Sequence, residues 1–317
     1  MGAFGFHKIV VVTRKTALEE LVERFGSKEQ AHFYLEHMGL PFVDYQNAHD
    51  VYHAALADLQ KAIPARQRAQ ILDRSFLPNF LFDPMDLVVT LGPDGLVVNT
   101  GKYTDGQPLL AFNPDPDRID GVLIPFSVAQ APHVLTRVLA WKYTHKEITL
   151  AQAALNDGQR LFAVNDLFIG QRTHVSARYR LRRGDREEDQ ISSGIIVSTG
   201  AGSTGWLRSV VTGASAVAEA FVHSKKIHAV RDRQRFDPSA ERLCFSVREP
   251  FVSRVSSADM VFGDINRGER LEIVSQMPQN GVIFSDGVEA DFLHFNSGAI
   301  AKIQVAEKKI FLVEKVT

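Results

Sequence analysis

The chain has 317 residues, of which 45% are hydrophobic and 23% charged, which is enough apolar material for one or two globular domains. Its 36 Lys and Arg balance its 37 Asp and Glu, and it has no sustained basic face, which argues against a nucleic-acid partner. The single cysteine, Cys244, cannot form an internal disulfide, and no apolar run is long enough to span a membrane. Since the N-terminus also lacks a signal-peptide pattern, we expect a cytoplasmic protein without a membrane partner.

The first third of the chain alternates strand-like and helical segments. Continuous apolar runs predict buried strands at Lys8–Thr13 and Asp86–Leu91, as in a parallel sheet covered on both faces. The other elements expected here are helices at Ala17–Phe25, Lys28–Met38 and His49–Ile63, and strands at Phe42–Tyr45 and Leu109–Phe112. This order predicts an N-terminal Rossmann-like α/β domain over residues 1–125.

The character of the sequence changes after Pro125. One helix is predicted at Ala131–Tyr143, and the charged segment Ser224–Ala240 is predicted to be an exposed excursion. Short alternating segments predict strands at Val175–Leu181, Leu243–Val247, Arg270–Val274, Val282–Phe284, Val288–Phe292 and Ile300–Val305. Residues 126–299 are therefore expected to form a mainly β domain.

The segment Gly194–Trp206 reads GIIVSTGAGSTGW and predicts a strand, a tight turn and a helix. Such a turn presents backbone N–H groups and hydroxyls at the positive end of a helix dipole, where a phosphate or ribose can bind. A purely structural turn with Ser203 or Thr204 as helix cap remains open. Because Gly200–Gly205 also matches G-x-G-x-x-G, an NAD(P)-dependent oxidoreductase with Asp232 as the ribose-binding acid is an alternative.

Three further positions carry polar groups where ligands can bind. Asp94 follows the strand Asp86–Leu91, which places it at the carboxyl edge of a parallel sheet, although a helix cap is the alternative. The pair Asn165-Asp166 interrupts an apolar run and indicates either a bulge or a site. Asp286-Gly287 lies between two strand-like segments and predicts a hairpin turn.

Metal signatures are weak in this sequence. His49 and His53 have H-x₃-H spacing, but on a helix with the pattern of an ordinary surface helix, so no metal site is predicted. The sequence has neither a Walker loop nor a G-x-S-x-G elbow, which argues against P-loop chemistry and nucleophilic catalysis.

Taken in order, these sites resemble those of the NAD kinase family. The resemblance includes Asn113-x-Asp115-Pro116-x-Arg118, and it is strongest to the mitochondrial-type branch through Asn165–Gly170, Trp206 and Phe245–Pro250. It extends from Lys8 to about Val313. It implies an α/β domain that binds nucleotide and is completed by residues 300–317, and a β-sandwich-like domain that binds the substrate.

The resemblance also implies an activity. An ATP-dependent kinase of this family phosphorylates the 2′-hydroxyl of the adenosine ribose of NAD to give NADP, with Mg²⁺ accompanying ATP and polyphosphate as donor in some members. Asp94 is then the catalytic base. The NAD-binding residues implied are Gly95, Asn165, Asp166, Ser198, Thr199, Gly202, Ser203, Thr204, Trp206, Asp286 and Gly287. A homo-oligomer, dimer or tetramer, is implied as well.

One loop departs from the family pattern. Gly92-Pro93-Asp94-Gly95-Leu96 stands where the family has Gly-Gly-Asp-Gly-Thr, so Pro93 removes a backbone N–H and Leu96 removes a hydroxyl. Losing two charge-assisted hydrogen bonds, each worth about 1.5–3 kcal/mol, would slow turnover by about 10²–10⁴-fold. The sequence therefore predicts a kinase with weakened activity. The alternative is a non-catalytic dinucleotide-binding or sensing protein of the same fold.

Overall fold

The computed structural model describes residues 5–222 and 234–317. Asp232 and most of the segment Ser224–Ala240 therefore lie outside the described residues. The chain forms two compact units, the first running to Lys146 and including Phe311–Thr317, and the second comprising Glu147–Ile310. The boundary after Lys146 is later than position 125, where the sequence places it, because the helix after Pro125 packs into the core of the first unit.

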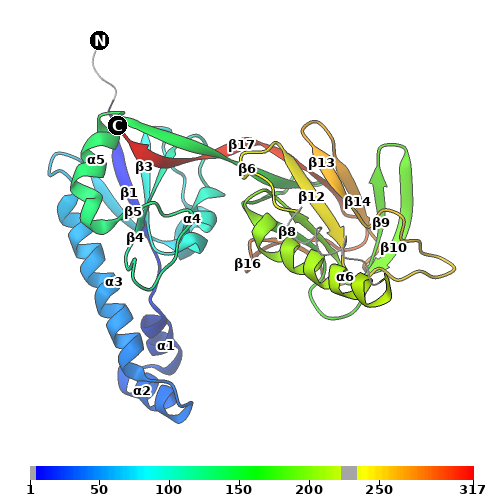
Figure 1. Ribbon diagram of the computed structural model, residues 1–317, viewed down its shortest axis with the longest axis horizontal. Helices are drawn as coiled ribbons and strands as arrows, with labels where there is room; N and C mark the ends of the chain where they lie inside the picture. The colour runs from blue at the N-terminus through cyan, green and yellow to red at the C-terminus, as the bar shows by residue number, and fades with distance from the viewer. Residues whose placement is uncertain (1–4, 223–233) are drawn as a thin grey trace. The chain divides into compact units, whose positions relative to one another are not determined.

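A parallel sheet forms the centre of the first unit, with the strand order β2-β1-β3-β4 (Figure 1). Its strands are β1 (Lys8–Thr13), β2 (Ala69–Asp73), β3 (Asp86–Leu91) and β4 (Pro108–Asn113), and the short β5 (Phe126–Ser127) pairs with β4. Residues Phe311 and Leu312 of β17 (Ile300–Val316) also pair parallel with β4. Every residue of β3 and β4 is buried, as the apolar runs predict for a sheet covered on both faces.

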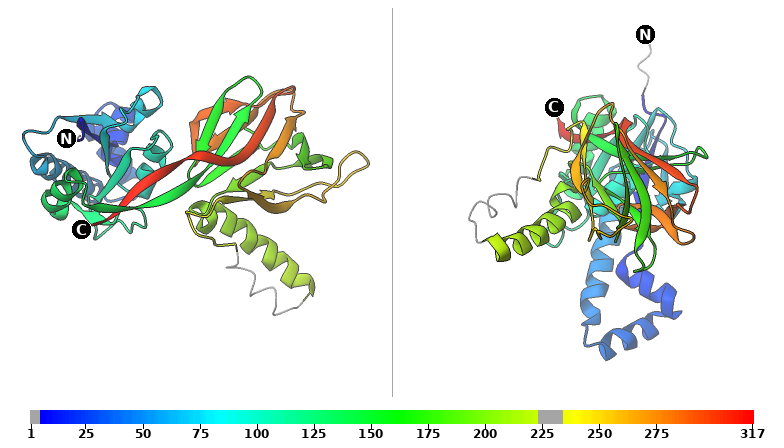
Figure 2. Two further views of the ribbon diagram at one scale, coloured as in Figure 1. Left: turned by 90° about the horizontal axis from the view of Figure 1, so that it is seen from above. Right: turned by 90° about the vertical axis from the view of Figure 1, so that its right-hand side faces the viewer.

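Helices cover this sheet and also extend beyond it. The helices are α1 (Ala17–Phe25), α2 (Lys28–His37), α3 (Phe42–Ala62), α4 (Asp94–Gly101) and α5 (Ala131–Leu139). Figure 2 shows α1 and α2 beside the part of α3 that lies away from the sheet. A capping box between Thr16 and Glu19 starts α1, and Gly26 ends it in the left-handed region at φ +85°.

Three local predictions are wrong or incomplete in this unit. Phe42–Tyr45 is the first turn of α3 and not a strand, because a segment of four residues with three apolar or aromatic side chains after Pro41 fits either structure. The helix α5 ends at Leu139, since Trp141 has a φ of +58° that a helix cannot continue. The strand β2 has no counterpart in the sequence analysis because it is an edge strand with three exposed residues out of five.

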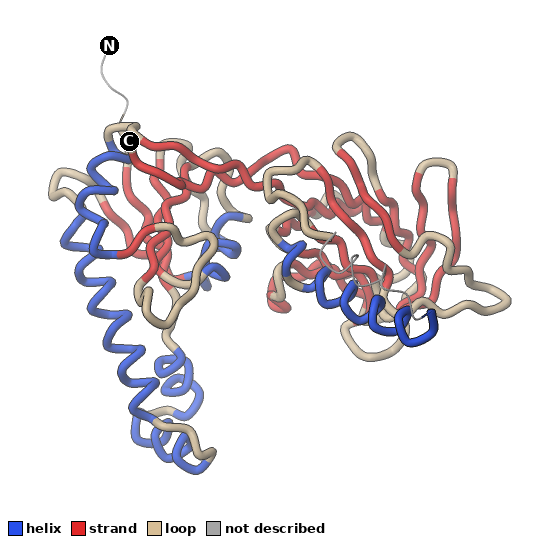
Figure 3. Tube along the Cα trace, in the orientation of Figure 1, coloured by secondary structure: helices blue, strands red, loops and turns tan. Residues whose placement is uncertain are grey.

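The second unit contains two mainly antiparallel sheets (Figure 3). One has the order β13-β12-β11-β8-β15-β16, and the other contains β10, β9, β14 and β17, with β6 and β7 beside them. Residues from both sheets, such as Ile169, Tyr179 and Phe245, share one buried apolar cluster. The prediction of an α/β domain followed by a β-sandwich-like domain is thus confirmed.

The strands and the helix of this unit have the following bounds: β6 (Tyr143–Leu155), β7 (Arg160–Ala163), β8 (Asp166–Gln171), β9 (Ala177–Arg183), β10 (Arg186–Ser192), β11 (Ile195–Ser198), α6 (Trp206–Val222), β12 (Arg242–Val247), β13 (Phe262–Asn266), β14 (Leu271–Ser275), β15 (Gly281–Ser285) and β16 (Val288–His294). Cys244 is buried in β12, and this burial raises the pKa of its thiol to about 12. Among the helices of the described residues, none is long and apolar enough to cross a membrane.

Candidate functional site

Three of the sequence-predicted sites meet in the second unit, at the ends of three neighbouring strands of one sheet. Asn165 and Asp166 stand at the start of β8, Ser198 at the end of β11, and Asp286 directly after β15. The strand β8 is antiparallel to both neighbours, with Asp166 opposite Ser198 and Leu167 opposite Ser285. Antiparallel pairing therefore brings together segments that lie more than thirty residues apart in the sequence.

Asp286 holds the Asn165-Asp166 segment in place. Its carboxylate accepts hydrogen bonds from the backbone N–H groups of Val164 at 3.1 Å, Asn165 at 2.7 Å and Asp166 at 3.3 Å. Asp286 and Gly287 both have a positive φ, at +56° and +71°, as a two-residue hairpin of type I′ requires. The Asp-Gly turn is thus the predicted hairpin and also a clamp on the segment before β8.

The glycine turn packs directly on the same segment. A Cβ on Gly202 would lie 2.3 Å from the carbonyl oxygen of Asn165, and a Cβ on Gly200 would lie 2.1 Å from that of Asp237. Thr199 donates its backbone N–H to the Asn165 carbonyl at 2.9 Å and its hydroxyl to the Val164 carbonyl. The protein's own close packing therefore requires these two glycines, whether or not a phosphate approaches them.

The predicted binding residues of the glycine turn and of the Asp286-Gly287 hairpin divide into two groups. Ser198, Thr199 and Ser203 are fully buried, and the Ser203 hydroxyl donates to the Gly200 carbonyl at 2.7 Å. Thr204 and Gly287 are exposed. The buried hydroxyls shape the turn, whereas the exposed positions can contact a ligand.

Asp166 has a strongly raised pKa. Burial raises its pKa to about 7; the nearby Asp286 charge adds to this rise, and a hydrogen bond from the Ser198 hydroxyl opposes it. Its Oδ1 is buried and has no hydrogen-bond partner among the described residues. A buried acceptor without a donor is unfavourable, so a ligand hydroxyl placed there would gain a strong hydrogen bond.

Trp206 contributes an aromatic group beside the turn. Its ring is stacked on Phe168 with 5.8 Å between centroids, and Phe168 is stacked on Phe284 at 4.8 Å. The guanidinium of Arg248 lies 5.6 Å from the centroid of the Trp206 ring. These contacts fix the ring where α6 begins.

In the first unit, Asp94 is the first residue of α4, and its side chain binds a loop that is distant in the sequence. Its two carboxylate oxygens accept hydrogen bonds from the backbone N–H groups of Val122 and Leu123, both at 2.9 Å. The side chain of Asp94 therefore does not cap the helix, because its partners lie in that loop and not in the first turn of α4. Gly95 beside it is exposed, whereas Leu96 is a core residue, 2% exposed.

A hollow of about 320 Å³ lies in the first unit at the carboxyl ends of parallel strands. It is lined by Arg14, Lys15, Thr16, Ala17, Ala48, Tyr52, Pro93, Pro114, Asp115, Arg118 and Ile119. The carboxyl edge of a parallel sheet is where α/β folds bind ligands. Three cationic side chains, Arg14, Lys15 and Arg118, make this hollow, called the basic pocket below, suited to a phosphate group. Two of them also have a carboxylate nearby, because Lys15 is paired with Glu23 at 2.6 Å and Arg118 lies 3.9 Å from Asp115.

Side chains of the first unit hold the basic pocket in shape. The Tyr52 hydroxyl donates to the Leu91 carbonyl at 3.2 Å and accepts the Arg14 N–H at 3.1 Å. The Asn113 amide donates to the Ile119 carbonyl at 2.8 Å, and its oxygen accepts the Asp115 N–H at 2.9 Å. Arg14 and Lys15 are not among the predicted site residues, although they follow the buried strand β1 just as Asp94 follows β3.

The oxidoreductase alternative lacks its structural context. A dinucleotide-binding G-x-G-x-x-G turn follows a strand of a parallel βαβ unit. Gly200–Gly205 follows β11, which is antiparallel to both β8 and β12.

Comparisons with known proteins give a fold. No protein-family profile matches the sequence, and no curated protein does. Among solved structures, a yeast NADH kinase complexed with NADH matches with a TM-score of 0.61 at 14% identity, over 99% of this chain and 85% of that one. The chain therefore has an NAD kinase-like fold.

Proposed function

We propose that this protein is a phosphotransferase that transfers the γ-phosphoryl group of ATP to the 2′-hydroxyl of the adenosine ribose of NAD or NADH. The fold likeness to a kinase that binds NADH supports this proposal over nearly the whole chain. The observation that carries it is the basic pocket, because a kinase must bind phosphates. Its cations Arg14, Lys15 and Arg118 stand at the edge of the sheet where Asp94 also lies.

In this proposal Asp94 accepts the proton of the attacking ribose hydroxyl. A positioned base contributes roughly 10²–10⁴-fold to the rate. The two hydrogen bonds from Val122 and Leu123 fix the carboxylate, and Pro93, the preceding residue, lines the basic pocket. Mg²⁺ would arrive with ATP and neutralise the phosphates, and Asp115 is the carboxylate that the pocket offers it.

The second unit would hold the dinucleotide. A ribose hydroxyl can donate to the unpartnered Oδ1 of Asp166, while the amide of Asn165 and the hydroxyl of Thr204 offer further donors and acceptors. Ser198, Thr199, Gly202 and Ser203, which were predicted to bind NAD, would act in this proposal by shaping the site. Asp286 acts in the same way, through the three backbone groups it binds.

The altered loop predicts a slow kinase. Pro93 supplies no backbone N–H, and Leu96 is buried against the core where the family has a hydroxyl. These two replacements also favour a second candidate function, a non-catalytic dinucleotide-binding protein of the same fold.

One experiment separates the two functions. The purified chain is incubated with NAD or NADH, with ATP or polyphosphate and Mg²⁺, and formation of the 2′-phosphorylated product is followed while calorimetry measures NAD affinity. Product formation supports the kinase. Tight NAD binding without product from any donor supports the binding protein, and the absence of both contradicts the proposal.

Two variants locate the sites. Arg118→Gln should slow product formation by roughly 10- to 100-fold, because a charge-assisted phosphate contact is worth about 1.5–3 kcal/mol. Arg66→Gln is the matched control, since Arg66 is exposed in the same unit and does not line the basic pocket.

Asn165→Ala should weaken NAD binding by roughly 5- to 100-fold through the loss of two or more hydrogen bonds. Unchanged NAD affinity in a folded Asn165→Ala protein would remove this residue from the site.

A further inference from the structure

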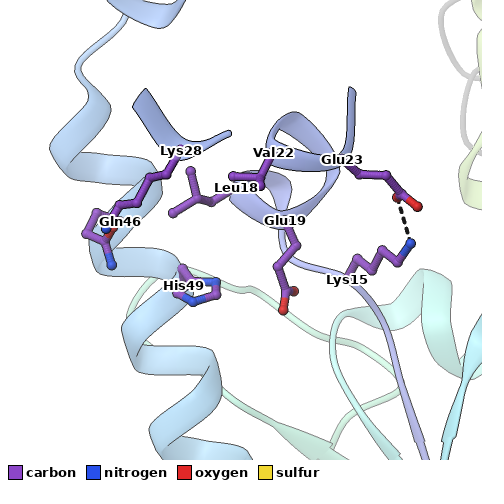
Figure 4. A pocket seen from close by; sticks show the side chains of 8 residues that line it. All are labelled: Lys15, Leu18, Glu19, Val22, Glu23, Lys28, Gln46 and His49. Carbon is purple, nitrogen blue, oxygen red and sulfur yellow. Dashed lines mark hydrogen bonds and ion pairs between the residues drawn. The ribbon is translucent and has the colours of Figure 1, made fainter. Parts of the chain in front are cut away.

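Two histidines and one carboxylate converge between α1 and α3. His49 and His53 are one turn apart on α3, with 4.3 Å between ring centroids. Glu19 lies in the first turn of α1, and its Oε1 is 3.0 Å from Nε2 of His53. One potential ligand atom from each of the three residues lies within 4.8 Å of the other two. Figure 4 shows Glu19 and His49 in the hollow of about 510 Å³ that α1 and α3 border.

We propose that Glu19, His49 and His53 bind a divalent transition-metal ion such as Zn²⁺ and thereby join α1 to α3. Two imidazoles and one carboxylate are a common zinc ligand set, and they leave a fourth position for water. Imidazole ligands favour Zn²⁺, Co²⁺, Ni²⁺ or Cu²⁺ over Mg²⁺ and Ca²⁺, which prefer oxygen. Tetrahedral ligands at about 2.1 Å from the metal are about 3.4 Å from one another, so a small rotation of these half-buried side chains suffices.

Thr16 supplies the support that metal-ligating residues usually have. Its Oγ1 is 2.9 Å from Nδ1 of His49, so the tautomer with the proton on Nδ1 donates to Thr16 and keeps Nε2 as the ligand. Thr16 also donates its backbone N–H to Oε2 of Glu19 at 2.7 Å. One residue thus orients two of the three ligands.

The charge of the site also suits a cation. Glu19 brings a carboxylate to the two imidazoles, and a carboxylate is a negatively charged ligand type for such an ion. The nearby Lys15 is paired with Glu23 at 2.6 Å, which offsets its charge. The ion pair between Glu19 and His53 uses two of the three residues, and His49, which Thr16 holds, adds a second imidazole beside them.

Zinc binding tests the proposal directly. Tag-free, full-length protein is freed of metal with EDTA, dialysed and titrated with ZnCl₂ by calorimetry. We expect one site that His49→Gln, His53→Gln and Glu19→Gln each weaken by at least tenfold. His32→Gln is the matched control, because His32 pairs with Glu36 at 3.1 Å on α2 as a histidine–carboxylate pair that has no third ligand among residues 5–222 and 234–317. This variant should bind Zn²⁺ like the native chain.

Two further measurements keep the result interpretable. Zn²⁺ at about 100 times its Kd should raise the melting temperature of the native chain by about 5–10 °C and leave that of His53→Gln unchanged. Co²⁺ bound to the native chain should give visible absorption bands that His49→Gln lacks. The proposal would be overturned if the native chain did not bind Zn²⁺. It would also be overturned if folded His49→Gln and His53→Gln bound Zn²⁺ with the same affinity as the native chain. If a glutamine variant does not fold, the native chain alone decides: one tight site with tetrahedral Co²⁺ bands supports the proposal, and octahedral bands contradict it.

Discussion

The raised pKa of Asp166 predicts an unusual dependence of stability on pH. Burial raises this pKa from 3.8 to about 7, so the folded chain keeps the proton to higher pH than the unfolded chain. Below about pH 4 the Asp166 carboxyl group is protonated in both the folded and the unfolded state and does not lower the free energy of unfolding. Between about pH 4 and pH 7 only the unfolded state ionises freely, so stability falls as the pH rises. Above pH 7 the full penalty is present, roughly 4 kcal/mol for a shift of about three units.

The substitution Asp166→Asn should remove this penalty, because the amide carries no charge. The variant should therefore be more stable than the native chain, and its advantage should grow by roughly 2–3 kcal/mol between pH 5 and pH 8. Urea unfolding at both pH values measures this difference. The chain has two tryptophans, so a Trp141→Phe background leaves Trp206 to report on the second unit.

Asp157→Asn is the control for this measurement. Asp157 is exposed in the same unit, and hydrogen bonds from Gln159 lower its pKa, so its replacement should give no advantage that grows with pH. An advantage of Asp166→Asn that is independent of pH, or smaller at pH 8 than at pH 5, would refute the assignment of a neutral buried carboxyl group. The reasoning from the unpartnered Oδ1 would then lose its support.

Four other substitutions have expected outcomes. Asp94→Asn should lower product formation by about 10²-fold or more with little change in NAD affinity, and equal rates would exclude the base. Leu96→Thr should lower the free energy of unfolding by roughly 2–4 kcal/mol, because it removes apolar volume and buries a hydroxyl; an unchanged melting temperature contradicts this. Pro93→Gly should speed phosphorylation about tenfold or more, at about 0.4–1 kcal/mol of stability, and no gain with any donor would show that the missing N–H is not limiting. Gly202→Ala should destabilise the second unit and weaken NAD binding, whereas Gly213→Ala in α6, with nothing within 4 Å of its Cβ, should do neither.

Sequence reasoning succeeded where burial alone determines the local structure. The strands Lys8–Thr13 and Asp86–Leu91 have the predicted bounds, because a strand buried on both faces needs an unbroken apolar run. It failed at Phe42–Tyr45, where a short run fits two structures, and at β2, which is exposed at an edge. These are the places where packing against the rest of the unit, and not the local pattern, decides.

The candidate site was predictable as a set of positions but not as a set of roles. Asp286 was expected as a hairpin turn and has that geometry. Its clamp on the backbone of Asn165 joins residues 121 positions apart, and no local pattern encodes such a pairing. The pocket-lining Arg14 was predictable, by contrast, because the rule that ligands bind beyond the carboxyl ends of parallel strands applies to β1 as well as to β3.

The buried residues of the glycine turn already have a structural role. Gly202 fits against the Asn165 carbonyl, and Thr199 bonds to the same segment, so the motif's composition serves the packing of β11 on β8. A chain could keep these residues for stability alone and lose its ligand. Evidence for binding therefore rests on the groups that packing leaves unsatisfied or exposed, which here are Oδ1 of Asp166 and the side chain of Thr204. By the same reasoning, the proposed catalysis depends on the cations of the basic pocket and on Asp94, since the apolar core already accounts for Leu96.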